Sequence, residues 1–259
     1  MKFAVVGDPI AHSMSPRMHM AAYAALGLPH TYEAIRANAD ELAAVVGRVR
    51  SGELAGLNVT VPHKVRVLDL ADEIAPSAAG AGAANTLVRE PSGRIVAHNT
   101  DVPALAAEIA RLSPPPGAAL VLGTGGASRA AVAALRGELA RERVVVRGRP
   151  LAPDPALERG VAIVVQATSC GMAGADPGEL VARAVAWDEL PAGAVAIDLV
   201  YAPPETPFLA EAKRRGLACA NGLGMLARQG AIAFELWLGR PAPTGAMLAA
   251  IAGSPANVA

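Results

Sequence analysis

Short apolar runs alternate with alanine-rich segments of helical periodicity along the first hundred residues. The runs KFAVV, HTYEAIRA and GLNVTV predict strands, and the segments near 16–26, 39–50 and 63–71 predict helices. This βαβ alternation is typical of a largely parallel sheet. The runs NTLVRE and RIVAHN follow, joined by the turn signal PSG, and predict a hairpin that closes a first lobe at about residue 100.

A second βα series follows a predicted helix at 101–112. Strands are expected at AALVLG, RVVVR, VAIVVQAT and VAIDLVY, and helices at 126–140 and 206–215. From Gly222 the pattern is helical again. The chain is therefore predicted to be an α/β protein of two lobes, with a second lobe of the nucleotide-binding type.

Composition and charge limit the partners. With 259 residues, 53% of them hydrophobic, the chain can bury one large core or two modest ones. Its 23 basic and 23 acidic residues are mixed along the chain, which favours a small-molecule partner over a nucleic acid or a membrane surface. Cys170 and Cys219 are too few for a disulfide framework or a zinc cluster. The start, MKFAVVGDP, has neither the length of a membrane span nor a cleavage region, so a cytoplasmic location is expected.

The stretch GDPIAHSMSPRMHM places two serines where a strand meets a helix. Ser15 suits an N-cap and Pro16 the first helical position, so the free N–H groups of the helix are expected to point toward Ser13 and Ser15. Two hydroxyls beside a helix N-terminus favour an anion such as a carboxylate. The alternative, that Ser15 only caps the helix, leaves Ser13 unexplained. His12 and His19 lack a metal-binding spacing and are interpreted as ordinary histidines.

Lys64 is one of only three lysines among the 23 basic residues, in the stretch NVTVPHK. The period of a strand places Asn58 and Thr60 on one face, and Pro62 is expected to start a helix with Lys64 in its first turn. Asp101 in HNTD lies where a strand gives way to the next helix, which suits either an N-cap or a catalytic acid.

The stretch LVLGTGGASRAAVAAL reads as a strand, a glycine-rich turn and a helix. Gly123, Gly125 and Ser128 have the spacing of a dinucleotide fingerprint, in which the backbone approaches a pyrophosphate. The next strand ends with Arg147 and Arg149, where an NAD enzyme typically has an acid, so arginine favours the 2′-phosphate of NADP. The alternative is that these are ordinary surface arginines.

The motifs together resemble the shikimate dehydrogenase family over nearly the whole chain: GDPIAHSMSPRMH, GLNVTVPHK, GAANTL, HNTD, GTGGASRA, ATSCGM, IDLVYAPPETPFL and NGLGMLARQGAIAFELW. The resemblance implies a substrate domain at 1–100, completed by about 229–259 through a returning C-terminal helix, and a Rossmann-like NADP domain at 101–228, with the active site in the cleft between them. It also implies NADP-dependent reversible oxidation of shikimate to 3-dehydroshikimate, without a metal, by a monomer or homodimer.

The resemblance assigns roles by matching positions. Lys64 and Asp101 are the implied catalytic pair. The implied substrate residues are Ser13, Ser15, Asn58, Thr60, Asn85, Tyr201 and Gln229, and the implied cofactor residues are Gly123, Gly125, Gly126, Ala127, Ser128, Arg149, Thr168, Gly222 and Met225.

Several residues depart from the family pattern. Only the eleven residues PLAPDPALERG separate Arg149 from the strand at about Val161, so the second lobe is expected to lack about one βα unit. Gly148 and Pro150 flank Arg149 where Asn and Thr are usual, Gln166 replaces an Asn, and Ala104 a Gly. Two alternatives remain: a family member acting on quinate or a related cyclic hydroxy acid, and a binding or sensor protein with weak cofactor affinity.

Overall fold

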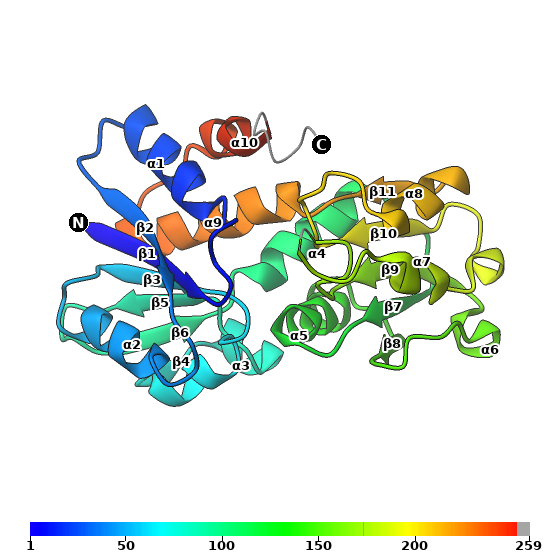
Figure 1. Ribbon diagram of the computed structural model, residues 1–259, viewed down its shortest axis with the longest axis horizontal. Coiled ribbons are helices and arrows are strands. Elements are labelled where there is room, and N and C mark those ends of the chain that lie inside the picture. Colours follow the sequence, from blue (N-terminus) through cyan, green and yellow to red (C-terminus); the bar gives the residue numbers. More distant parts are fainter. Residues whose placement is uncertain (173, 253–259) are drawn as a thin grey trace. The chain divides into compact units, whose positions relative to one another are not determined.

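The protein is represented by a computed structural model that describes residues 1–172 and 174–252 (Figure 1). It divides into two compact units. The first unit is Met1–Asp101 with the described part of Leu226–Gly253, and the second unit is Val102–Met225. The predicted lobes divide at 100/101 and 228/229, within three residues of these divisions. The predicted C-terminal stretch includes 253–259, which lies outside the described residues.

The first unit is built on one mixed sheet. Its strands are β1 (Lys2–Gly7), β2 (Thr31–Arg36), β3 (Gly56–Val59), β4 (Glu73–Ile74), β5 (Thr86–Arg89) and β6 (Ile95–His98). They lie in the order β2-β1-β3-β5-β6-β4. β1 is parallel to β2 and β3, whereas β5 is antiparallel to β3 and β6. The hairpin predicted from the PSG turn is thus confirmed as β5–β6.

The helices of the first unit are α1 (Ser15–Ala25), α2 (Leu42–Arg50), the 3₁₀ helix η1 (Arg66–Leu70), α3 (Pro76–Ala81), α9 (Leu223–Leu238) and α10 (Thr244–Ala252). α10 packs on α1. In α2 the apolar residues recur at helical spacing, and Leu42, Val45, Val46 and Val49 are all buried. They belong to the same core cluster as Leu57 of β3, so this face of α2 packs on the sheet.

Trp237 fixes α9 to the sheet of the first unit. Its indole Nε1 donates a hydrogen bond to the carbonyl oxygen of Leu87 at 3.0 Å. Its ring stacks on Phe3 with the centroids 4.9 Å apart. A Cβ atom built on Gly56 would lie 2.2 Å from the indole nitrogen, so only glycine fits there. The predicted return of a C-terminal helix to the first lobe is confirmed.

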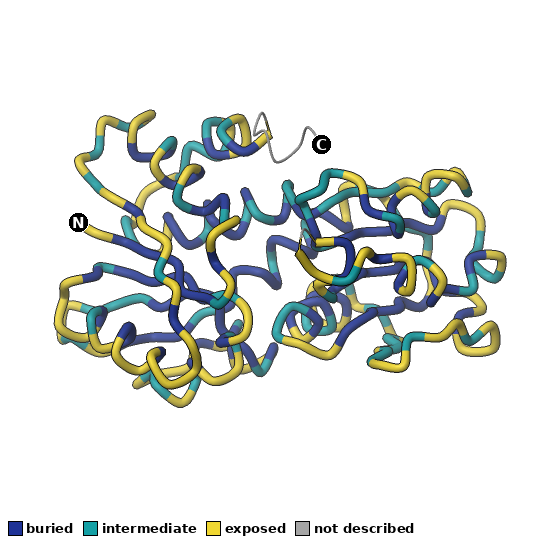
Figure 2. Tube along the Cα trace, viewed as in Figure 1, coloured by how far each residue is buried: buried dark blue, intermediate teal, exposed yellow. Residues whose placement is uncertain are grey.

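The second unit contains a parallel sheet. Its strands are β7 (Ala118–Leu122), β8 (Val144–Arg147), β9 (Val161–Gln166), β10 (Val195–Asp198) and β11 (Ala218–Ala220), in the order β11-β10-β9-β7-β8. All their pairings are parallel. The helices are α4 (Asp101–Arg111), α5 (Gly126–Ala133), α6 (Pro155–Glu158), α7 (Glu179–Arg183), the 3₁₀ helix η3 (Trp187–Glu189) and α8 (Pro207–Arg214). Figure 2 shows β7, β9 and β10 as buried runs, which explains their nearly continuous apolar sequences.

The connection from β8 to β9 is short, as predicted. In the described chain it contains the four-residue helix α6 and no further strand. β8 therefore forms an edge of the sheet, paired with β7 alone. The shortened second lobe expected from PLAPDPALERG is confirmed.

Two predicted helices are shorter than expected. The helix predicted at 126–140 ends as α-helix at Ala133 and continues as a π-helical turn over Ala134–Glu138. That turn contains Gly137, a weak helix former. The helix predicted at 63–71 is a turn followed by η1, because the β-branched residues Val65 and Val67 favour α-helix only weakly in so short a segment. Across the described ranges, no helix is both long and apolar enough to span a membrane.

Candidate active site

Lys64 and Asp101 form a largely buried ion pair. The turn after β3 carries Lys64, and Asp101 is the first residue of α4. The Lys64 Nζ lies 2.7 Å from Asp101 Oδ2, and the two side chains are only 13% and 5% exposed. Asn99 Oδ1 accepts the Asp101 N–H at 3.0 Å and so fixes the start of α4. The fold thus brings an ammonium and a carboxylate that are 37 positions apart in sequence into direct contact.

Asn85 orients the Asp101 carboxylate. Its Nδ2 donates to Asp101 Oδ1 at 2.8 Å and to Gln229 Oε1 at 3.4 Å. Its Oδ1 accepts the Thr100 N–H at 2.7 Å, which determines which end of the amide faces Asp101. Each carboxylate oxygen of Asp101 therefore has its own donor, one from Lys64 and one from Asn85.

Asn58 lies in β3 beside this pair and is 4% exposed. Its Nδ2 donates to the carbonyl oxygen of Asn85 at 3.2 Å and to Thr86 Oγ1 at 3.0 Å. Its Oδ1 accepts the Tyr32 hydroxyl at 2.6 Å. Sequence reasoning missed Tyr32 as a residue near the site. The feature that could have drawn attention to it is the scarcity of tyrosine, because the chain has only three.

His19 packs against Tyr32, the tyrosine that bonds Asn58. The two rings are stacked, with centroids 4.3 Å apart and planes within 2°. Burial raises the pKa of the Tyr32 phenol well above its ordinary value, while a hydrogen bond with Ser15 opposes that shift. Burial lowers the pKa of His19 to about 3, so its ring is neutral near neutral pH. His19 is thus a packing residue, whereas His12 is exposed.

Ser13 and Ser15 lie at the N-terminal end of α1. The prediction that Ser15 is the N-cap is wrong: Met14 has that position with helical dihedral angles (φ −84°, ψ −5°), and no side chain caps the helix. Ser15 and Pro16 therefore share the first turn, where proline costs no hydrogen bond. Ser13 Oγ accepts the Ser15 N–H at 3.3 Å. Two hydroxyls still lie beside a helix N-terminus, a place that suits an anion.

Thr60 follows β3, which ends at Val59, so the prediction that Thr60 lies within the strand is wrong by one residue. Its backbone N–H still bonds the carbonyl oxygen of Val6 at 2.9 Å, so its direction follows β3. Its Cγ2 would lie 2.5 Å from a Cβ atom on Gly7, which explains the glycine at the end of β1.

The glycine-rich turn of the second unit joins β7 to α5. Gly123 has a φ of +119°, and a Cβ atom there would lie 2.9 Å from the carbonyl oxygen of Ala167. Ser128 Oγ donates to the Gly123 carbonyl oxygen at 2.6 Å and closes the turn. Gly125 caps α5 with open space beside its Cα atom, and Gly126 and Ala127 form the first turn. This end of α5 can accept a phosphate on its backbone N–H groups.

Arg147 and Arg149 have different environments at the end of β8. Arg147 Nη1 lies 2.6 Å from the fully buried Glu158 Oε1 and also donates to the Ala184 carbonyl oxygen. Arg149 is exposed, and within the described part of the chain it has no hydrogen bond or ion pair. Of the two predicted arginines, Arg149 is therefore the one available to an anionic ligand.

Three of the remaining predicted residues lie on loops after strands of the second unit, and the fourth, Met225, lies on α9. Thr168 follows β9, and its Oγ1 accepts the Cys170 N–H at 3.1 Å. Tyr201 follows β10 and is half-buried. Gly222 packs against Leu199, the residue after β10, since a Cβ atom on Gly222 would lie 2.3 Å from the Leu199 carbonyl oxygen. Met225 lies in the first turn of α9 and is 8% exposed.

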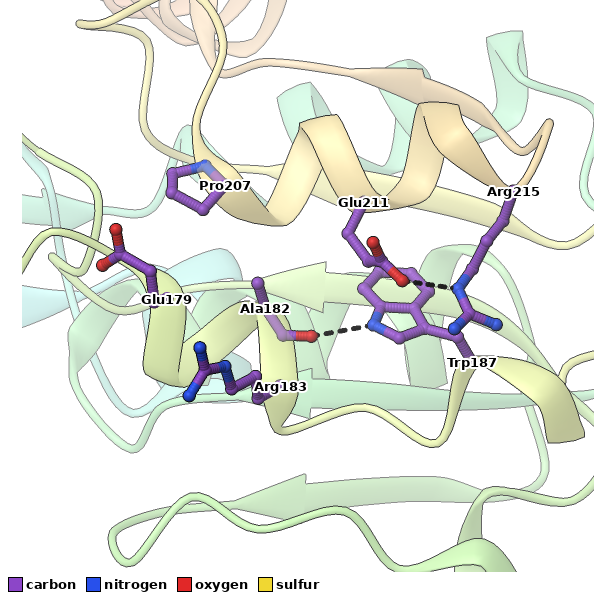
Figure 3. Close-up of a pocket in the computed structure, with 7 residues that line it drawn as sticks. All are labelled: Glu179, Ala182, Arg183, Trp187, Pro207, Glu211 and Arg215. Atoms are coloured by element: carbon purple, nitrogen blue, oxygen red, sulfur yellow. Dashed lines mark hydrogen bonds and ion pairs between the residues drawn. The ribbon is translucent and has the colours of Figure 1, made fainter.

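Figure 3 shows a surface pocket of about 380 Å³ between α7 and α8. Trp187 is one of the lining residues, and its Nε1 donates to the Ala182 carbonyl oxygen at 2.8 Å. None of its seven lining residues is a predicted site residue. Elsewhere, among residues 1–172 and 174–252, no cluster of His, Cys, Asp and Glu side chains could hold a metal ion.

The sequence and the fold both match known proteins. Family models match residues 5–87, as a shikimate dehydrogenase substrate binding domain, and 222–252, as a shikimate 5'-dehydrogenase C-terminal domain. A shikimate dehydrogenase (NADP(+)) of Methylobacterium radiotolerans is 41% identical over 93% of this chain and 92% of its own length. One from Citrifermentans bemidjiense is 39% identical over 96% and 93%.

A solved structure is similar over the same extent. The shikimate 5-dehydrogenase of Thermus thermophilus, in complex with NADP(H) and shikimate, superposes with a TM-score of 0.83. It is 37% identical, and the match covers 96% of this chain and 98% of that one. Sequence identity at this level over nearly full length, with the same fold, establishes common descent. The chain therefore belongs to the shikimate dehydrogenase family.

Proposed function

We infer that the chain catalyses the NADP-dependent, reversible oxidation of shikimate to 3-dehydroshikimate, physiologically in the direction of reduction. Its relatives are named for this activity, and the Thermus thermophilus enzyme was solved with both ligands. The observation that carries the proposal is the ion pair of Lys64 and Asp101, because it supplies a proton donor held at a fixed point.

Lys64 moves the proton in this proposal. In the reduction direction its ammonium gives a proton to the carbonyl oxygen of the substrate as the carbonyl carbon gains a hydride, and in oxidation the neutral amine takes the hydroxyl proton. Asp101 accepts a hydrogen bond from Nζ and so holds the amine in place. Asn85, through Asp101 Oδ1, keeps the carboxylate from turning away.

The substrate is held by the first unit in this proposal. Ser13 and Ser15, at the N-terminus of α1, bind the carboxylate. The ring hydroxyls are bound by the polar group around the ion pair, which comprises Asn58, Thr60, Asn85 and Gln229, with Tyr201 of the second unit as a further substrate residue. Asn58 already bonds Tyr32, Asn85 and Thr86, so its part is to offer the remaining lone pair of Oδ1.

The second unit fits a dinucleotide. The N-terminus of α5 is open at Gly125, and its first turn can accept the pyrophosphate. Arg149 is exposed and unpaired within the described chain, as a partner for the 2′-phosphate should be. Thr168, Gly222 and Met225 are proposed to line the nicotinamide end. Hydride transfer is the chemistry that the nicotinamide supplies when bound.

The domain roles follow from these assignments. The first unit, which contains the stretch matched by a substrate binding domain model, is proposed as the substrate domain, and the second as the cofactor domain. The monomer or homodimer state, the cytoplasmic location and the lack of a nucleic-acid partner stay predictions.

The test is a spectrophotometric assay. Purified protein mixed with shikimate and NADP should generate the absorbance of reduced nicotinamide, and quinate should be a poorer substrate. Turnover of quinate in preference to shikimate would assign the chain to the alternative substrate. Binding of shikimate without turnover of either compound would support a sensor instead.

A further inference from the structure

Three buried polar side chains lie together at the carboxyl ends of β9 and β10. Gln166 ends β9, Asp198 ends β10 and Thr206 precedes α8. Gln166 and Asp198 are 0% exposed and Thr206 is 1% exposed. Polar groups buried to this degree are costly unless their hydrogen bonds are satisfied.

Gln166 fixes the loop that follows β9. Its Oε1 accepts the Thr168 N–H at 2.5 Å, and its Nε2 donates to the Cys170 carbonyl oxygen at 2.9 Å. The same Nε2 donates to Asp198 Oδ1 at 3.1 Å. One side chain therefore holds two points of the loop that carries Thr168 and joins it to β10.

Asp198 fixes the loop that follows β10. Its Oδ1 accepts the Val200 N–H at 2.9 Å, and its Oδ2 accepts the Thr206 hydroxyl at 2.5 Å. Thr206 Oγ1 in turn accepts the Leu209 N–H at 3.3 Å and caps α8. The carboxylate thus joins both ends of the loop that carries Tyr201.

Close packing joins these loops to each other and to a third. A Cβ atom on Gly171 would lie 2.9 Å from Thr206 Cγ2, so the first loop rests on the second. The Gly222 N–H bonds the Val200 carbonyl oxygen at 3.1 Å, so the segment before α9 rests on the second loop as well. A shift of either loop would therefore move Thr168, Tyr201 and Gly222 together.

We propose that Gln166 and Asp198 are positioning residues, which hold the loops carrying Thr168, Tyr201 and Gly222 in the geometry that binds the cofactor. Neither can touch a ligand, because both are fully buried. The inference rests on the proposed function, which places the nicotinamide against these loops. Besides bonding each other and Thr206, Gln166 and Asp198 form hydrogen bonds with the backbone of the loops, at Thr168, Cys170 and Val200. Such bonds are expected of groups that set loop geometry.

The test compares Thr206→Val and Gln166→Leu with a matched control, Trp187→Phe. The control loses a buried hydrogen bond of the same unit, from Trp187 Nε1 to Ala182, that involves no atom of the three loops, and a phenyl ring there can keep the contact with Phe208. All three variants should unfold at a lower temperature. Only Thr206→Val and Gln166→Leu should weaken the calorimetric Kd for NADP, by about tenfold, because small displacements of contact groups are costly. Thr206→Ser, which keeps the hydroxyl, should restore wild-type affinity.

Two further measurements separate the possibilities. Shikimate binding without cofactor should weaken less than NADP binding in the variants, since Tyr201 alone of its proposed contacts lies on these loops. Hydrogen exchange at the Thr168 and Val200 amides should be faster in Gln166→Leu than in Trp187→Phe. Variants with lower Tm but wild-type NADP affinity would refute the positioning role. A wild-type protein inactive on shikimate would refute the proposed function, and the NADP affinities would still decide the role of Gln166 and Asp198.

Discussion

At the scale of the residue, the scarcity of lysine in this chain helps to identify a functional residue. Arginine replaces lysine at most basic positions, and the three lysines are Lys2, Lys64 and Lys213. Lys213 pairs with Glu205 on the surface, whereas the Lys64 side chain is 13% exposed and pairs with a buried carboxylate. The arginine side chain is larger and stays protonated, so it can neither fit nor exchange a proton as lysine does.

We expect Lys64→Ala to lower kcat by about 10² to 10⁴. Shikimate binding should weaken only modestly, because the role of Lys64 is proton transfer. Steady-state kinetics with NADP, together with calorimetry for shikimate, measures both effects. Lys213→Ala is the matched control and should retain full activity, since an exposed ion pair contributes little. Near-normal kcat in Lys64→Ala would show the assigned mechanism to be wrong.

Asp198 should make stability depend on pH. Burial, opposed by hydrogen bonds from Thr206 and Val200, raises its pKa from 3.8 to about 6. Between these values the folded protein keeps a proton that the unfolded chain has lost, so the free energy of unfolding falls as pH rises from about 4 to about 6. At the scale of about 1.4 kcal/mol per pKa unit, the loss is about 2–3 kcal/mol.

Urea denaturation of wild type and Asp198→Asn at pH 4 and pH 7 measures this effect. The variant lacks the titrating group, so its stability relative to wild type should improve by about 2–3 kcal/mol between the two pH values. A difference that is the same at both pH values would contradict the assignment.

At the scale of the element, helix ends carry the proposed ligand contacts. α1 is eleven residues long, with two serine hydroxyls at its N-terminal end. The Ser15 N–H bonds Ser13 Oγ and Pro16 has no N–H, so the serine hydroxyls are the main donors at this end. α5 begins at Gly126 without a side-chain cap, so its first N–H groups remain available. The strands bring these helix starts to the carboxyl edges of their sheets, where ligands of open α/β sheets bind.

We expect Ser13→Ala to raise the KM for shikimate, and Ser13→Ala with Ser15→Ala to raise it further, with NADP affinity unchanged. Each lost hydrogen bond to a charged group is worth about 1.5–3 kcal/mol, or roughly one to two decades in affinity. Ser51→Ala is a control, since that hydroxyl bonds the Arg48 carbonyl oxygen at the end of α2. An unchanged KM in the double variant would return both serines to a structural role.

The two arginines at the end of the edge strand β8 should have different roles, Arg149 in NADP binding and Arg147 in stability. Arg149→Ala should weaken NADP binding, by at most about tenfold because exposed charges are solvated, and should leave NAD binding and Tm unchanged. Arg147→Ala should instead destabilise the fold by about 3–5 kcal/mol, because it leaves the buried Glu158 carboxylate unpaired. Cofactor titrations and thermal melts of both variants test this contrast. NADP affinity indifferent to Arg149 would refute its assignment.

Most of the strands, most of the helices and the meeting of Lys64 with Asp101 could be predicted from sequence, because period and punctuation are local signals and strand ends converge. The short strands β4 and β11 were missed, because two or three residues are too few for a period to show. Side-chain pairings that depend on tertiary packing could not be predicted. The pairing of Arg147 with Glu158 requires the course of the chain through α6. The bond from Tyr32 to Asn58 requires the parallel order β2-β1-β3, which places a strand between them.

At the scale of the whole molecule, the first unit is formed by two distant segments of the chain. Trp237 is a main link between them, since it packs over Gly56 and bonds Leu87. We expect Trp237→Ala to destabilise the protein by about 3–5 kcal/mol through lost packing. Trp237→Phe should cost less, because it keeps most of the ring contact with Phe3. Chemical denaturation of both variants measures the difference, and equal losses would assign the effect to the indole hydrogen bond instead.

A ribosome completes the second unit before it completes the first. Val102–Met225 is continuous, whereas the sheet of the first unit gains its contact with α9 only when Trp237 has been made, more than 130 residues after Asp101. At about 5–20 residues per second this interval is on the order of ten seconds. During it, the face of β3 at Gly56 has no indole to cover it. The nascent N-terminal sheet is therefore among the first parts of this protein to be synthesised and among the last to be fully covered.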